Sequence, residues 1–114
     1  MPNNNLSIEN TFSALSDPTR RAVVQTLSTG PATVSQLADP FDMALPSFTQ
    51  HLGVLESAGL IVSRREGRTR ICSLNPEALQ NAEDWLAEHR RQWEGRLDRF
   101  EAHLAKAKED KSNE

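Results

Sequence analysis

The sequence has few residues of the kinds that cross-link a chain or bind metals, with one cysteine and three histidines among 114 residues. A single thiol excludes a disulfide within the chain. A metal site needs several converging thiolate or imidazole ligands, and these four side chains are scattered along the sequence. We therefore expect no intrachain disulfide, no bound metal and no other cofactor.

Long apolar runs are also missing. No stretch approaches the length that crosses a bilayer, and the polar first residues lack the apolar segment of a secretory signal. A single thiol also fits a reducing compartment. Together these features predict a cytoplasmic protein that does not enter a membrane.

The sequence also lacks an excess of positive charge. Its formal net charge is -3 at pH 7. This argues against nucleic-acid binding through bulk charge, although net charge does not decide what a local patch can do.

The sequence also shows no nucleophile-base arrangement, phosphate loop or paired-acid site, so we expect that the protein is not an enzyme. The length fits one domain, and the hydrophobic fraction of 37% is slightly low, which indicates a core partly shared with another chain.

Proline and glycine residues stand where helices should begin and end. A short first helix stops at Ser16, and Asp17 caps a second helix whose first position is Pro18, where the missing N–H has no cost. Gly30 ends this second helix. The apolar line of the first helix is Ile8, Phe12 and Leu15.

The next two helices are joined by a short connector. Thr33, followed three residues later by Gln36, is a capping-box pattern that predicts a short third helix, which Pro40 ends or bends. A fourth helix opens at Pro46 and stops at Gly59, which can take the left-handed cap conformation. This outline is typical of a helix-turn-helix. The predicted inward face of the fourth helix carries Leu45, Phe48, Leu52 and Leu55.

Two β-prone runs, LIVSRR and RTRICSL, are separated by Glu66-Gly67. A two-residue link that ends in glycine is typical of a β-hairpin turn. Cys72, near the base of this hairpin, is expected to pack as a small apolar group. Four arginines lie at the tip and along the flanks of the predicted hairpin: Arg64, Arg65, Arg68 and Arg70.

A last helix is expected to begin at Asn75-Pro76 and to run to about Lys108, a span of roughly 50 Å. Its apolar residues recur at heptad-like steps, with one stutter between Trp93 and Leu97. A monomer would expose this stripe to water, so we predict that a second copy covers it; the alternative is that the helix folds back on its own domain. The predicted dimer interface comprises Phe12, Trp85, Leu86, Trp93, Leu97 and Phe100.

These elements predict a mostly α fold with a small β-hairpin, that is, a winged helix-turn-helix with a long C-terminal dimerisation helix. The winged helix-turn-helix is expected over residues 6–80 and the long helix over residues 76–108. Residues 1–5 and 109–114 are expected to be flexible tails.

The fourth helix would present its outer side to the major groove of double-stranded DNA, which is wide enough to admit a helix. Its helical wheel turns Ser47 and Gln50 most directly outward, with His51 at the edge of that face and Thr49 nearer the core. These four side chains can bond base edges or phosphates. The alternative is that they are ordinary solvated surface residues.

The hairpin arginines favour the DNA-binding interpretation. Flexible guanidinium groups at a hairpin tip can reach phosphates beside the groove or enter a narrow minor groove. The alternative is that they protect the edge of the sheet from pairing with other chains. Protection would need only one or two pairs of alternating charge, whereas the arginine charges are of one sign.

Four segments, FSALSDPTRRAVVQTL, VSQLADPF, LPSFTQHLGVLESAGLI and RREGRTRICSL, resemble in this order the arsenic-repressor (ArsR/SmtB-type) family of bacterial winged-helix transcriptional regulators. The resemblance covers about residues 6–80, while the long last helix resembles the family only loosely. It implies a homodimer built mainly from the first and last helices, a palindromic operator near a promoter and repression by occlusion. It also implies that Ser47, Gln50 and His51 lie on the recognition helix.

Two departures from the family pattern are visible. Ala44 stands where relatives often have a serine that caps the recognition helix. Metal-sensing relatives carry a Cys-Xaa-Cys pair in the first helix of the motif or an Asp-Xaa-His set in the last helix, and neither is present here. The resemblance therefore implies a regulator without the usual metal ligands. The operator, the regulated genes and the effector do not follow from the sequence.

A function of another class stays open. A winged-helix module can use the long helix to hold a protein partner, and the acidic net charge favours this alternative. A stoichiometric protein partner and no preferred DNA sequence would distinguish the module from a regulator.

Overall fold

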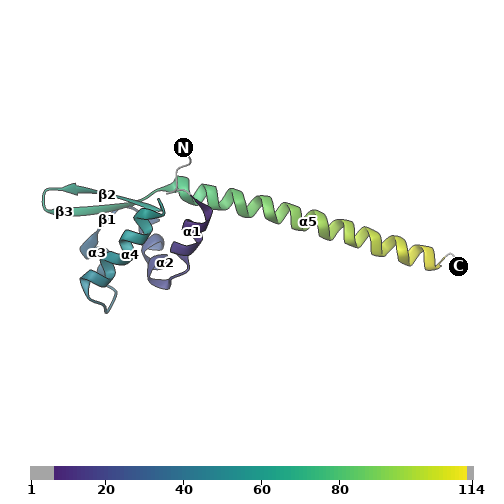
Figure 1. Ribbon diagram of the computed structural model, residues 1–114, viewed down its shortest axis with the longest axis horizontal. Helices are drawn as coiled ribbons and strands as arrows, with labels where there is room; N and C mark the ends of the chain where they lie inside the picture. The colour runs from purple at the N-terminus through teal and green to yellow at the C-terminus, as the bar shows by residue number, and fades with distance from the viewer. Residues whose placement is uncertain (1–6, 113–114) are drawn as a thin grey trace. The chain divides into compact units, whose positions relative to one another are not determined.

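The computed structural model describes residues 7–112 of the chain. The chain divides into two compact units, Met1–Ala82 and Glu83–Glu114. The first unit holds four helices, a small sheet and the first residues of the last helix (Figure 1). Its helices are α1 (Ile8–Leu15), α2 (Pro18–Leu27), α3 (Val34–Ala38), α4 (Leu45–Ser57) and the start of α5 (Pro76–Ser112). Its strands are β1 (Ala32–Thr33), β2 (Ile61–Glu66) and β3 (Thr69–Leu74).

The mostly helical, winged helix-turn-helix fold expected from the sequence is confirmed. The sheet is antiparallel with the strand order β1-β3-β2, so the predicted hairpin gains a third strand. This strand has only two residues, Ala32 and Thr33, which pair with Cys72 and Ile71. So short a strand has no alternation of its own, which is why the sequence predicted the hairpin alone.

The hairpin turn lies one residue later than predicted. Glu66 pairs with Thr69, so the two turn residues are Gly67 and Arg68 and not Glu66 and Gly67. Gly67 has a φ of 62°, and the described residues other than glycine have no positive φ. A two-residue turn with glycine and a positive φ at its first position matches the type II′ turn. The glycine therefore sets the register of the hairpin.

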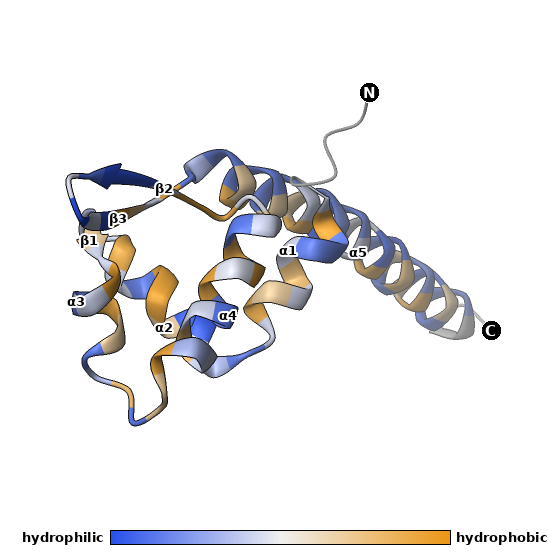
Figure 2. Ribbon diagram, turned by 60° about the vertical axis from the view of Figure 1, so that its left-hand side comes forward, coloured by the Kyte–Doolittle hydropathy of each residue, from blue (hydrophilic) through white to orange (hydrophobic). Residues whose placement is uncertain are grey.

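The core of the first unit lies between the helices and the base of the hairpin. Figure 2 shows apolar residues on the inner sides of the helices and at the hairpin base, and hydrophilic residues on its outer half. Phe48, Leu52 and Leu55 of α4 are fully buried, as predicted, but Leu45 is 56% exposed. Leu45 is the first residue of α4 and lies about one turn before the residues that pack into the core, so its predicted inward position was wrong.

The buried face of α1 also differs from the expected apolar line. The buried residues of this helix are Thr11 and Ala14, whereas Phe12 is 36% exposed. Thr11 satisfies its hydroxyl by donating to the Ser7 carbonyl at 3.1 Å. Small side chains on the inner face allow α1 to pack closely on α2 and α4.

The helix ends follow the predicted local rules. The Asp17 carboxylate accepts from the backbone N–H of Arg20 at 3.0 Å, and both bonds of the Thr33-Gln36 capping box are present. Ala44 is the N-cap residue before α4 and makes no side-chain hydrogen bond there. At the other end of α4, Gly59 has a φ of 76°. The backbone bonds after α4 run from residue 60 to 55 and from 59 to 56, the pattern of a Schellman cap.

The second unit consists of the remainder of α5. The helix continues to Ser112, so residues 109–112, which were expected in the tail, are helical. These residues follow a stretch rich in alanine, lysine and glutamate, which favour helix, and no proline or glycine interrupts it. The other predicted tail residues, 1–5 and 113–114, lie outside the described residues.

The apolar side chains of this unit are solvent-exposed. Six large ones are between 38% and 57% exposed: Trp85, Leu86, Trp93, Leu97, Phe100 and Leu104. Trp85 stacks on His89 with ring centroids 3.9 Å apart, and the Nδ1 of His89 donates to the Trp85 carbonyl at 2.9 Å. Across residues 7–112, no helix combines the length and apolar character needed to span a membrane.

Candidate nucleic-acid interface

The four side chains expected to contact DNA lie on α4, but they differ in solvent exposure and in their hydrogen bonds within the chain. Ser47 and Gln50 are exposed. Thr49 is half-buried, and its hydroxyl donates to the Pro46 carbonyl at 3.0 Å. His51 is 24% exposed and is bonded to a neighbouring helix. Two of the four side chains are therefore open to a ligand, and two also have contacts within the chain.

His51 contacts α2 and its cap through one ring nitrogen. Its Nδ1 lies 3.1 Å from a guanidinium nitrogen of Arg20 and 3.7 Å from the Asp17 carboxylate. The backbone N–H of Arg20 is the main cause that lowers the pKa of Asp17; partial burial opposes it, and the charge of His51 adds to the lowering. The cap residue therefore stays ionised beside α4.

Two arginines of α2, Arg20 and Arg21, donate to backbone carbonyls of α1. Arg20 donates from Nε to the Ala14 carbonyl at 2.7 Å and from Nη2 to the Ser13 carbonyl at 3.3 Å. Arg21 donates to the Leu15 carbonyl at 2.8 Å. These carbonyls lie in the last turn of α1, so the arginines help to cap its C-terminal end; the Ser13 carbonyl also accepts from the backbone N–H of Ser16 at 3.2 Å.

The hairpin arginines fall into two pairs. Arg70 is partly buried and binds Glu56 in the last turn of α4, while its Nε donates to the Ser63 hydroxyl at 3.1 Å. The Ser63 hydroxyl in turn donates to Glu56 at 2.7 Å. Arg64 pairs with Glu66 at 3.1 Å. Two of the four predicted contact arginines are thus already neutralised by carboxylates.

Arg65 and Arg68 make up the second pair. Both are exposed, and neither forms an ion pair or side-chain hydrogen bond within residues 7–112. Arg68 is also a residue of the hairpin turn, where its side chain is furthest from the base of the sheet. Free positive charge on the hairpin is therefore concentrated at its outer end.

A shallow recess of about 430 Å³ joins the hairpin to the helix-turn-helix. Thr49 of α4 lines it together with Arg68 and Arg70 of the hairpin. Thr33, Val34 and Ser35, at the start of α3, complete the lining with Thr69. Hydroxyl groups and guanidinium groups in one concave surface suit a phosphate oxygen.

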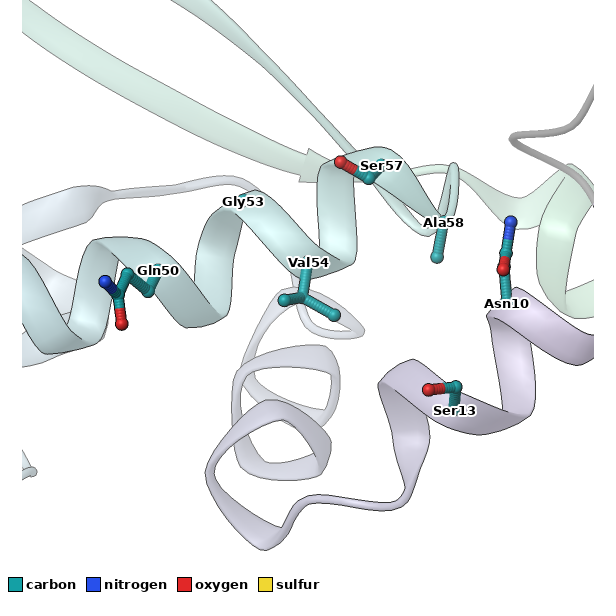
Figure 3. Close-up of a pocket in the computed structure, with 7 residues that line it drawn as sticks. All are labelled: Asn10, Ser13, Gln50, Gly53, Val54, Ser57 and Ala58. Atoms are coloured by element: carbon teal, nitrogen blue, oxygen red, sulfur yellow. The ribbon is translucent and has the colours of Figure 1, made fainter.

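A second, larger recess of about 600 Å³ lies between α1 and α4. In Figure 3, Gln50 and Val54 point from α4 toward this space, and Ser13 projects from α1. Its lining contains no charged side chain. Within residues 7–112, no group of three histidine, cysteine or acidic side chains is placed to hold a metal ion.

Cys72 lies fully buried at the base of the hairpin, so its expected apolar packing is confirmed. Burial raises the pKa of this thiol; the nearby Arg70 guanidinium opposes that effect and Glu56 adds to it. The neutral thiol therefore persists above its ordinary titration range, and its nucleophilicity is low.

The sequence did not predict the roles of two residues in this region, Glu56 and Arg20. Glu56 anchors a hairpin residue 14 positions away, and Arg20 contacts a histidine 31 positions away. Neither pair has a local spacing rule, because helix and hairpin patterns relate only near neighbours. Only the packed fold brings their partners into reach.

Comparison with known proteins agrees with this architecture. The family described as helix-turn-helix domain matches residues 15–64. The chain is 37% identical over 79 residues to the transcriptional repressor SdpR of Bacillus subtilis (strain 168), covering 69% of this chain and 88% of SdpR. It is 33% identical over 90 residues to the arsenic resistance transcriptional regulator ArsR2 of Pseudomonas putida, covering 68% of this chain and 78% of that protein.

A solved structure is similar over most of its length. The crystal structure of the ArsR family transcriptional regulator RHA00566 is 53% identical in sequence and has a TM-score of 0.73, covering 75% of this chain and 89% of that one. These relatives are transcription regulators and not enzymes. The fold, the arrangement of α4 beside the hairpin and these similarities show that the chain belongs to the ArsR family of helix-turn-helix, DNA-binding transcriptional regulators.

Proposed function

We propose that this regulator is a homodimeric repressor that binds a palindromic operator with α4 in the major groove and the hairpin on the flanking backbone. The observation that carries the proposal is the recess shared by Thr49 of α4 and Arg68 of the hairpin turn. It means that the polar face of the helix and the free charge of the hairpin border the same surface. A duplex can then contact both at once.

Base recognition is assigned to Ser47 and Gln50, the exposed residues of the helix face. The amide of glutamine can bond both N6 and N7 of adenine, and a serine hydroxyl can donate or accept at several base edges. Gln50 is therefore expected to contribute most to the choice of sequence.

Backbone contact is assigned to Arg65 and Arg68, because their guanidinium groups have no carboxylate partner in the described chain. Arg64 and Arg70 have such partners and are assigned to holding the hairpin in place. This division narrows the four hairpin arginines predicted from the sequence to two phosphate contacts. Such contacts strengthen binding to any sequence and weaken as salt rises.

Dimerisation is assigned to the apolar side of α5, with Phe12 of α1 as a further contact. The exposed fractions of Trp93, Leu97 and Phe100 leave much apolar area in water in a single chain, and a second copy would remove it. Two-fold pairing would suit recognition helices in successive major grooves, about 34 Å apart. Repression is inferred from SdpR, which is a transcriptional repressor.

Selection of DNA from a random pool, followed by mobility-shift titration of the enriched sequence, tests the proposal. Enrichment of a two-fold symmetric site is expected. The Gln50→Ala variant should prefer different bases at one position of each half-site, since a bidentate contact discriminates between bases by about 1 to 3 kcal/mol. Gln25→Ala, at an exposed site on α2, is the matched control and should keep the wild-type preference. A pool without any enriched sequence would contradict the proposal.

A second candidate function is a protein-interaction module that uses α5. The exposed tryptophan, leucine and phenylalanine side chains of that helix favour it, since apolar stripes bind protein partners of other kinds as well as second copies. Affinity capture from the native cell extract distinguishes the two functions. A stoichiometric partner together with no selected DNA would favour the module.

A further inference from the structure

Arg20 connects three helices through separate atoms. Its backbone N–H donates to the Asp17 cap of α2, and its Nε and Nη2 donate to the Ala14 and Ser13 carbonyls that end α1. Its remaining terminal nitrogen, Nη1, reaches Nδ1 of His51 on α4 at 3.1 Å. A side chain held at three nitrogens has little freedom, so the position of Nη1 beside the histidine is fixed.

The contact with Arg20 decides which nitrogen of His51 carries a proton. A guanidinium remains charged and offers only donors, so Nδ1 of His51 has to accept this hydrogen bond. A neutral imidazole has one donor and one acceptor nitrogen, and its proton therefore lies on Nε2. The Asp17 carboxylate, 3.7 Å from Nδ1, becomes a partner only when the ring is doubly protonated. In that state Nε2 also carries a proton.

Nε2 is free to bond a ligand. It has no hydrogen-bond partner within residues 7–112, and that part of the chain contains no buried side-chain nitrogen or oxygen without a partner. An unpartnered Nε2 must therefore be accessible to solvent. It belongs to the residue next to Gln50 on α4.

We propose that Arg20 is a positioning residue that makes His51 a donor-only contact to DNA, an inference that rests on the proposed function. In both protonation states His51 presents N–H from Nε2. It bonds a phosphate oxygen or a base acceptor such as N7 or O6 of guanine or O4 of thymine. It does not accept from the amino groups of adenine or cytosine. A serine or glutamine at the same surface has no such restriction, so Arg20 narrows what His51 can recognise.

The tautomer of His51 can be measured in the full-length protein without DNA. Nitrogen NMR of ¹⁵N-histidine-labelled protein, at a pH where the ring is neutral, should show Nε2 protonated and Nδ1 unprotonated. Arg20→Met removes the three side-chain donors and should populate the other tautomer. Arg21→Met is the matched control, because Arg21 also caps an α1 carbonyl but has no contact with His51. A proton on Nδ1 in the wild type, or an unchanged tautomer in Arg20→Met, would overturn the proposal.

Two substitutions of His51 test the contact with DNA and do not depend on whether Arg20→Met folds. A glutamine amide lies near the position of Nε2, whereas an asparagine amide lies near that of Nδ1. His51→Gln should bind the selected operator within about threefold of the wild type per half-site, and His51→Asn about tenfold more weakly per half-site, as expected for one lost hydrogen bond in each subunit. His51→Gln should also relax the base preference, since its amide adds an acceptor.

The outcomes separate this inference from the function on which it rests. If the wild type selects an operator and the glutamine and asparagine variants bind it equally well, the inference fails and the proposed function stands. If the wild type selects no DNA sequence, both fail, whatever the tautomer. A larger loss in His51→Gln than in His51→Asn would place the contact at Nδ1 and would also overturn the proposal.

Discussion

The two strands of the hairpin carry the same residue type in different states. Arg65 of β2 and Arg70 of β3 are Cα partners, yet the Arg70 guanidinium is partly buried and is held by Glu56 and the Ser63 hydroxyl. Arg65, and Arg68 in the turn, are exposed and have no side-chain partner in the described chain. Arginines a few positions apart can therefore serve as an anchor or as a free contact, and the residues that the fold places beside each one decide which.

The largest effect is expected from removing the two free arginines of the hairpin. The double variant Arg65→Ala and Arg68→Ala should bind all DNA sequences about a hundredfold more weakly per half-site at low salt, since each charge-assisted contact contributes on the order of 1.4 kcal/mol. The slope of log affinity against log salt should fall by roughly two for each subunit, or roughly four for the dimer. Denaturant unfolding should give a free energy within about 0.5 kcal/mol of the wild type. An unchanged salt slope would show that the tip is not a phosphate contact.

The next largest effect concerns the turn that presents the tip. Gly67→Ala places a side chain at a φ of 62°, which should reduce the free energy of unfolding by about 1 to 2 kcal/mol. The cost is conformational, because an added Cβ at this position meets no atom within 4 Å. Gly67→Asn, which tolerates this backbone region better, is the control. Equal unfolding midpoints for both variants would argue against the strained turn.

The arginines that pair with carboxylates should respond in stability more than in binding. Arg70→Ala leaves Glu56 without its cation and should lower the free energy of unfolding by about 1 kcal/mol, a modest value because both side chains are about one-third exposed. Arg64→Ala, which breaks a more exposed ion pair, should change it by less than about 0.5 kcal/mol. Salt titration of DNA binding should leave the slope of both variants unchanged. A loss of about two in the slope of Arg70→Ala, one for each subunit of the dimer, would return that residue to the phosphate contacts.

The smallest effect is expected on the pH dependence of stability, from the buried thiol of Cys72 in β3. Because burial raises the pKa of Cys72, both folded and unfolded chains keep the proton below the ordinary value of 9.0. As the pH rises past that value the unfolded chain ionises first, so the free energy of unfolding should fall. Denaturant unfolding at pH 8 and pH 10 measures this fall, and Cys72→Ala should lose that part of the dependence. An identical pH dependence in the two proteins would contradict a raised pKa.

Local signals predicted the helix-turn-helix well. The cap at Asp17, the capping box of Thr33 and Gln36, and the stop at Gly59 depend on residues within one turn, and the structure contains all three. The sequence also shows that Ala44 supplies no side-chain cap, and the structure agrees. Such features follow from spacing alone because a helix end is satisfied by its nearest neighbours.

Longer-range features could not be predicted in this way. The third strand, the exposure of Leu45 and the pairing of Arg70 with Glu56 each depend on which element packs alongside. The turn register shifted by one residue because glycine took the first turn position and Glu66 joined the strand pairing. Charge and hydrophobicity patterns name the candidates for a contact, and tertiary structure selects among them.

The exposed stripe on α5 has a consequence for abundance. If two copies must meet along Trp93, Leu97 and Phe100 before an operator is filled, the ratio of occupied to free operator depends on roughly the square of the number of chains wherever monomers predominate. A twofold drop in synthesis would then lower that ratio about fourfold. Transcription would respond to the concentration of this protein in the cell, without a small-molecule effector having to bind it.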